Sequence, residues 1–179
     1  MKKFIFTLML VTLSFGAYAQ KGMQGVGLSL NFGIMEENHS TIYPITTLKY
    51  QYYIHDNIRL VPSLTLGCTN IYYDNTFSYN VNPNPYSYYV NPYLQTDFFL
   101  CQIKKFRPYL SVALGCSIAE TLDVTKTYAA SAFNLKCGMG MEWRVAYNWT
   151  IQCSGNFSLD VGEFDAIGAF ASIGFVYNF

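Results

Sequence analysis

The clearest pattern in the chain is an alternation of apolar and small residues over its last fourteen positions, 166–179. Every second residue from Ile167 to Phe179 is apolar, and the residues between them are mostly small. A period of two indicates a β-strand, because successive side chains of a strand point to opposite faces. A tilted strand crosses a bilayer in about 9–11 residues, so this segment is long enough. We therefore predict that it is the closing strand of a membrane barrel.

Seven earlier segments show the same alternation, and their apolar positions run through Val26–Ile34, Leu48–Ile54, Leu60–Cys68, Val90–Leu100, Phe106–Cys116, Phe133–Trp143 and Trp149–Leu159. The predicted connections alternate in length. Longer connections are expected at Met35–Pro44, Asn70–Ser87 and Ser117–Ala130. Short turns are expected at His55–Asn57, Cys101–Lys105 and Val145–Asn148, with a modest connection at Val161–Asp165. The pattern predicts an all-β fold, an eight-stranded antiparallel up-and-down transmembrane β-barrel with longer extracellular loops and periplasmic termini.

The first nineteen residues are typical of a secretory signal peptide. Lys2 and Lys3 precede an apolar run from Phe4 to Phe15, and Ala17-Tyr18-Ala19 forms a small-x-small cleavage site. A membrane-anchor helix is the alternative, but such a helix needs about 18 or more apolar residues. The sequence therefore divides into a signal peptide, 1–19, and an outer-membrane β-barrel, 20–179.

Charge is scarce and lies on one face of the predicted strands. Charged residues make up 12% of the chain, aromatic residues 18%, and the formal net charge is zero. Nucleic-acid binding needs a basic stripe, which this balance does not supply. Every charge within a predicted strand falls on the polar face: Lys49, Arg59, Asp97, Arg107, Lys136, Glu142, Arg144 and Asp160. A charge facing lipid near the midplane costs roughly 2–4 kcal/mol, so this segregation favours a membrane barrel over a soluble one.

These eight charges predict a network inside the barrel. We expect Asp97 to approach Arg107, Lys136 to approach Asp160, and Glu142 to reach Arg144 or Arg59. A gated polar path is one interpretation, and a structural network that plugs the lumen is the other. Eight strands enclose an interior just wide enough for side chains to fill, which favours the plug.

Aromatic residues on the apolar face gather at one predicted end of the barrel. The set lies near the three short turns or the C-terminus and consists of Tyr52, Phe98, Phe106, Trp143, Trp149, Tyr177 and Phe179. Such a girdle is expected at the periplasmic interface of a membrane barrel.

The signal peptide, the eight alternating strands, the short turn around His55 and the terminal Phe175-Val-Tyr177-Asn-Phe179 resemble the small outer-membrane β-barrel superfamily. The resemblance is to OmpA/OmpX-type eight-stranded barrels and, more closely, to PorT-like outer-membrane β-barrel proteins. It covers the whole chain after residue 19. It implies location in the outer membrane of a Gram-negative bacterium, contact with outer-membrane lipid, and an assembly signal, Phe175, Tyr177 and Phe179, that is similar to the one read by the barrel-assembly machinery. The resemblance specifies architecture and carries over no functional residue.

Candidate chemistry is sparse. An enzyme on this scaffold needs a nucleophile with a base in reach, but His39 falls in a predicted loop and His55 in a turn, so no catalytic residue is assigned. The five cysteines contain no CxxC spacing, and no metal or cofactor site is predicted. The connection Asn70–Ser87 carries aromatic residues among Asn, Ser and Pro, namely Tyr72, Tyr73, Phe77, Tyr79 and Tyr86. Tyr, Ser and Asn are typical of adaptable binding surfaces, although a loop that shields the barrel mouth is the alternative.

The sequence thus predicts a non-enzymatic integral outer-membrane protein with a structural role or a cell-surface interaction role, adhesion or ligand binding, through its extracellular loops. The surface ligand is not identified. A narrow, porin-like transmembrane pore for small solutes is the alternative function.

Overall fold

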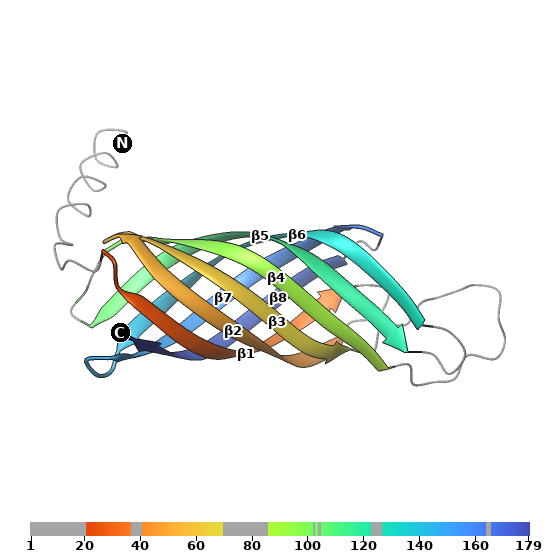
Figure 1. Ribbon diagram of the computed structural model, residues 1–179, viewed down its shortest axis with the longest axis horizontal. Helices are drawn as coiled ribbons and strands as arrows, with labels where there is room; N and C mark the ends of the chain where they lie inside the picture. The colour runs from red at the N-terminus through yellow and green to blue at the C-terminus, as the bar shows by residue number, and fades with distance from the viewer. Residues whose placement is uncertain are drawn as a thin grey trace.

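The computed structural model describes residues 21–36, 41–69, 86–101, 103, 105–122, 127–163 and 166–179. These residues form eight strands: β1 (Gln24–Glu36), β2 (Thr41–His55), β3 (Ile58–Thr69), β4 (Tyr86–Phe99), β5 (Phe106–Leu122), β6 (Thr127–Arg144), β7 (Trp149–Gly162) and β8 (Ala166–Asn178). The strands close into one barrel in sequence order (Figure 1). Among the described residues there is no helix with the length and apolarity to cross a membrane.

Each strand pairs antiparallel with the strands before and after it in the chain, and β8 closes the barrel by pairing with β1. The closing ladder runs from Gly25 opposite Asn178 to Glu36 opposite Ile167. Figure 1 shows the C-terminus at the end of the barrel where the short turns lie. We call this the turn end and the opposite one the loop end. The predicted eight-stranded up-and-down barrel is therefore confirmed.

The two faces of the wall have opposite chemistry. Outward side chains such as Leu94 and Leu114 are 51% and 52% exposed, whereas inward Asn91 and Ser117 are fully buried. The exterior is apolar because the alternate positions of every strand carry Leu, Ile, Val, Phe and Met, and the lumen is filled by the polar and small residues between them. The predicted assignment of faces is confirmed wherever side chains are described.

Close packing in the lumen depends on glycines opposite large side chains. A Cβ built on Gly140 of β6 would lie well inside van der Waals contact of the nearest atom of the Tyr109 ring of β5, and one on Gly33 would overlap the Phe170 ring in the same way. A clash of this kind forces neighbouring side chains to move. Aromatic rings in the lumen thus pack directly against the backbone of these glycines.

Several predicted connections belong to strands. β5 and β6 pair from Phe106 opposite Trp143 as far as Leu122 opposite Thr127, so most of the expected connection Ser117–Ala130 is a strand pair. Parts of Met35–Pro44 and Val161–Asp165 are also paired, and Tyr86 and Ser87 begin β4. Apolar alternation fades toward the loop end of these strands, but backbone pairing continues because it requires no apolar face. The sequence pattern therefore marked only the part of each strand that has an apolar outer face.

The predicted signal peptide, most of the predicted binding loop and His39 lie outside the described residues. The loop residues concerned are Tyr72, Tyr73, Phe77 and Tyr79. Of the cysteines, Cys116, Cys137 and Cys153 are free and exposed on the outer face, and Cys101 is free beside a turn.

Candidate functional site

The eight predicted lumen charges all occupy inward positions of the strands, but the structure brings only four together. These four form the Arg59 cluster, namely Arg59, Asp97, Arg107 and Glu142, near the turn end of β3 to β6. Lys49, Lys136, Arg144 and Asp160 lie outside it. The cluster is assembled by register, because Arg59 stands directly opposite Asp97 and Arg107 directly opposite Glu142.

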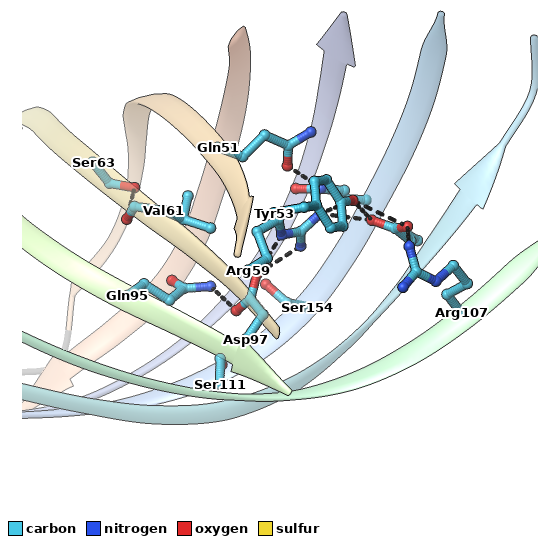
Figure 2. A network of polar contacts seen from close by, with 12 residues as sticks. Gln51, Tyr53, Arg59, Val61, Ser63, Gln95, Asp97, Arg107, Ser111 and Ser154 are labelled. Carbon is cyan, nitrogen blue, oxygen red and sulfur yellow. Dashed lines mark hydrogen bonds and ion pairs between the residues drawn. The ribbon is translucent and has the colours of Figure 1, made fainter. Parts of the chain in front are cut away.

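Arg59 is the centre of the cluster, as Figure 2 shows. Its Nη2 and Nε donate to Asp97 Oδ2 at 2.6 and 2.9 Å. Its Nη1 donates to Glu142 Oε2 at 2.6 Å and to the Tyr53 hydroxyl at 3.0 Å. The side chains of Arg59 and Asp97 are 1% and 0% exposed. A planar guanidinium suits this position because its fixed fork of donors can hold two carboxylates at once.

Three aromatic rings surround the guanidinium of Arg59. Its Cζ lies 5.4, 4.8 and 5.3 Å from the ring centroids of Tyr53, Phe99 and Tyr109. The Tyr53 and Phe99 rings stack at 5.9 Å, and Phe99 meets Tyr109 edge-on at 5.6 Å. Sequence reasoning missed this aromatic cage, although inward parity on the polar face was a signal that these rings would meet inside the barrel.

Arg107 completes the Arg59 cluster at the turn end of the lumen. Its Cζ lies 3.8 Å from the centroid of the Phe99 ring. Nη1 donates to Glu142 Oε1 at 3.2 Å and Nη2 to the carbonyl of Asp56 at 2.6 Å. Two arginines and two carboxylates thus balance in charge, and buried charges persist only when paired and hydrogen-bonded in this way. The arrangement links β3, β4, β5 and β6 to the β2–β3 turn across the lumen.

Neither Asp97 with Arg107 nor Lys136 with Asp160 is among the salt bridges of the described residues, and register explains both. Asp97 stands opposite Ser111, so Arg107 is four residues too far along β5 and pairs with Glu142 instead. Asp160 stands opposite Asn134. Lys136 donates to Asn91 Oδ1 at 3.1 Å and forms no salt bridge with Asp160 in the described part of the chain. Glu142 does contact Arg59, one of its two predicted partners.

A second polar group fills the lumen nearer the loop end. Asp160 Oδ1 accepts hydrogen bonds from Ser117 Oγ at 2.5 Å and Asn134 Nδ2 at 2.6 Å. Asn91 Nδ2 donates to the same serine oxygen at 2.6 Å. Lys136 Nζ lies 3.9 Å from the Tyr93 ring centroid. This chain of contacts joins β4, β5, β6 and β7, so cross-lumen bonding extends well beyond the Arg59 cluster.

At the loop end the wall is uneven. The β6–β7 ladder stops at Ala132 opposite Gly162, whereas β6 remains paired with β5 back to Thr127. Residues 127–131 of β6 therefore form an edge that carries no strand on its β7 side among the described residues. Figure 1 shows β5 and β6 reaching furthest toward the loop end. Sequence reasoning missed this edge because it assigned residues 127–130 to a connection.

The aromatic girdle predicted at the turn end is present on the outer surface. Its members are exposed, with Phe106 stacked on Trp143 at 5.5 Å and Trp149 edge-on to Tyr177 at 5.2 Å. Phe175, Tyr177 and Phe179 all face outward. The role of these three residues as an assembly signal stays a prediction.

The described residues contain no group of three His, Cys, Asp or Glu side chains placed to hold a metal ion. His55 closes the β2–β3 turn, where its Nδ1 accepts a 3.4 Å hydrogen bond from the amide of Asn57. This hydrogen bond gives His55 a structural role in the turn.

No protein-family profile and no curated protein sequence matches the chain. Solved structures do. Neisserial surface protein A is 13% identical, with a TM-score of 0.72, and the match covers 89% of this chain and 100% of that one. Ail, the attachment invasion locus protein of Yersinia pestis, is 13% identical over the same shares, with TM-scores of 0.62 alone and 0.63 in complex with the heparin analogue sucrose octasulfate. The outer membrane protein AlkL is 13% identical, with a TM-score of 0.52 over 91% and 92% of the two chains.

Identity at this level shows the fold alone, and no comparison tests the PorT-like resemblance, which stays a prediction. The likeness in fold covers about nine tenths of this chain and nearly the whole of each of those structures. The chain therefore has the fold of the small eight-stranded outer-membrane β-barrels of the OmpA/OmpX type.

Proposed function

We propose that this protein is a non-enzymatic outer-membrane scaffold that presents a protruding β-sheet for interaction at the cell surface. The observation that carries the proposal is the extension of β5 and β6 beyond the last β6–β7 pair. A strand needs about 9–11 residues to cross the bilayer, and β5 and β6 have 17 and 18. The additional residues of β5 and β6 form a paired two-stranded sheet that is not needed to cross the bilayer.

The lumen supports a scaffold better than a pore. The Arg59 cluster spans the interior near the turn end with buried side chains and charge-assisted hydrogen bonds. A conducting path would have to separate these groups, and breaking a buried ion pair costs about 3–5 kcal/mol. The narrow pore predicted as an alternative is therefore the less favoured function.

The sequence of the longer connections indicates the kind of partner. Together with the adjoining strand ends, these connections contain the acidic residues Glu36, Glu37, Asp74, Glu120, Asp123, Glu163 and Asp165 and one basic residue, Lys126. Ail has been solved with an anionic heparin analogue. An anion would be repelled here, so we expect a cationic partner for this chain.

Two measurements on the full-length protein test this function. In planar bilayers the purified protein should show no discrete single-channel steps. On intact cells, a cysteine introduced at Ser131, at the loop end, should react with a membrane-impermeant maleimide, whereas one introduced at Ala146, in a turn, should not. Each should be compared with the parent chain, whose own cysteines set the background. Channel steps, or labelling at residue 146 instead of 131, would overturn the proposal.

A further inference from the structure

Two cations stand side by side at the turn end, on the rim of the barrel between β5 and β6. The β5–β6 ladder begins at Phe106 opposite Trp143, so Lys105 and Arg144 are the next residues in register beyond it. The amide of Arg144 donates to the Lys105 carbonyl at 3.0 Å, which keeps the two residues adjacent. Residues directly opposite each other in an antiparallel ladder are close enough for their side chains to interact.

These two charges differ from those of the lumen because they have no counter-ion. Two residues further into the barrel, Arg107 stands opposite Glu142 and pairs with it. Lys105 is exposed and Arg144 is partly exposed, and neither forms a salt bridge with any described residue. Like charges directly opposite each other destabilise a sheet. An anion bound between the two side chains would remove this repulsion.

The adjoining aromatic pair places the cations at the level of lipid headgroups. Phe106 and Trp143 stack at 5.5 Å on the outer face, and aromatic belts lie at the interface between membrane and water. A strand rises about 3.4 Å per residue, whereas each headgroup layer is about 5–8 Å thick. Lys105 and Arg144 lie one residue beyond the belt and therefore fall within this layer, where the phosphates of lipids are the abundant anions.

We propose that Lys105, Arg144 and the Phe106–Trp143 pair form a binding site for an anionic phospholipid of the leaflet that surrounds the turn end. The phosphate lies between the Lys105 ammonium and the Arg144 guanidinium, which can donate two parallel hydrogen bonds to it. The acyl chains run past the aromatic pair along the apolar outer face. Phosphatidylglycerol fits this site better than phosphatidylcholine, whose headgroup would add a third cation. The site and the recognition surface proposed above lie at opposite ends of the barrel, and neither depends on the other.

Tryptophan quenching measures lipid binding at the site itself. The chain has two tryptophans, Trp143 and Trp149, so in a Trp149→Phe background the fluorescence reports on Trp143 alone. The full-length protein in phosphatidylcholine vesicles is titrated with phosphatidylglycerol brominated on its acyl chains, which quenches on contact, and separately with brominated phosphatidylcholine. We expect phosphatidylglycerol to bind beside Trp143 at least about fivefold more tightly than phosphatidylcholine, the effect of one cation near an anionic surface.

Variants separate this pair of cations from the general charge of the turn end. Lys105→Gln combined with Arg144→Gln removes both charges, so the two brominated lipids should then quench Trp143 equally. Lys21→Gln is the matched control, because Lys21 is an exposed cation that lies at the same end but outside the pair. It should retain the preference of the parent for phosphatidylglycerol. A heat-modifiable band on unboiled gels verifies that each variant is folded.

Equal quenching of the parent by the two lipids would overturn the proposal, as would an undiminished preference in the folded double variant. A loss in Lys21→Gln as large as in the double variant would also overturn it, because diffuse surface charge would then explain the preference. Water-soluble glycerol phosphate at the same concentration should not relieve the quenching; if it did, a free phosphate would be the occupant. Binding of the parent, but not of the double variant, to purified peptidoglycan would likewise assign the two cations to a different partner.

Discussion

Arg59 shows how a single residue can link several strands across the lumen of a barrel. Its guanidinium contacts two carboxylates and a tyrosine hydroxyl while three aromatic rings exclude water from it. The low dielectric of such a site strengthens the ion pairs and makes an unpaired charge costly. Arg59 therefore contributes mainly by keeping Asp97 and Glu142 paired, and its removal would leave both carboxylates buried with fewer donors.

We predict that Arg59→Ala lowers the free energy of unfolding by about 3–5 kcal/mol, the cost of breaking a buried ion pair. Arg144→Ala is the matched control, because Arg144 is an inward arginine that is less buried and forms no salt bridge within the described residues. Its loss should cost less than about 1 kcal/mol. Urea titration in lipid vesicles, followed by tryptophan fluorescence, measures both. Equal losses would show that the cluster adds no special stability.

At the scale of residues, the sequence predicted which side chains face the lumen better than it predicted their partners. Parity alone assigns a side chain to a face, so all eight charges were placed inward. Pairing also depends on register. Asp97 lies directly opposite Arg59 in the β3–β4 ladder, but in the β4–β5 ladder it lies opposite Ser111, four residues from Arg107. The contribution of Tyr53 was missed because its ring meets Arg59 only after the β2–β3 turn folds back.

At the scale of elements, glycines determine how large rings fit inside the wall. The Tyr109 ring of β5 lies over Gly140 of β6, where a Cβ would clash with it. On the outer face, Gly155 of β7 has no atom within 4 Å of the position a Cβ would take. The same substitution should therefore have different effects on adjacent strands.

We predict that Gly140→Ala destabilises the barrel by about 1–3 kcal/mol, the usual cost of overpacking, because it pushes Tyr109 away from Arg59. Gly155→Ala should be neutral or stabilise the protein by up to about 1 kcal/mol, since it restricts the unfolded chain without a clash. Equilibrium unfolding in the same vesicles compares the two variants. If Gly140→Ala proved as stable as Gly155→Ala, Tyr109 would not be fixed over the glycine.

Strand existence and facing could be predicted from alternation, but strand length could not. Residues from Ser117 to Ala130 form a polar stretch with no clear period, so the sequence indicated a connection there. In the structure, β5 and β6 stay paired through it because each supplies the other's backbone hydrogen bonds. The protruding edge depends on this pairing, so it was not visible in the residues alone.

At the scale of the whole molecule, the barrel separates stability from recognition. Ladders between all neighbouring strands, including β8 with β1, satisfy the backbone hydrogen bonds of the wall. The outward Leu, Ile, Val and Phe side chains form the apolar exterior, and the ion pairs lie in the lumen. Segments at the loop end can therefore change without loss of the features that hold the barrel together.

The connection between β3 and β4 tests this separation. The β3–β4 ladder ends at Thr69 opposite Ser87, so replacing residues 71–84 by a four-residue Gly-Asn linker leaves every strand pair of the barrel in place. Shortening a connection lowers the entropic cost of bringing its ends together, and each halving of its length is worth about 0.6 kcal/mol. We expect the shortened protein to be as stable as the parent or more stable, by up to about 1 kcal/mol, with unchanged β-rich circular dichroism and a heat-modifiable band on gels.

The same variant separates the two surfaces that could bind a partner. It lacks Tyr72, Tyr73, Phe77 and Tyr79 of the predicted binding loop but keeps the β6 edge. If the edge is the binding surface, the shortened protein should bind a cationic peptide as the parent does. If the tyrosines supply the contacts, binding should fall although the barrel is folded. Loss of the folded band would show that residues 71–84 support the wall, because a connection that only joins two strands can be shortened without unfolding them.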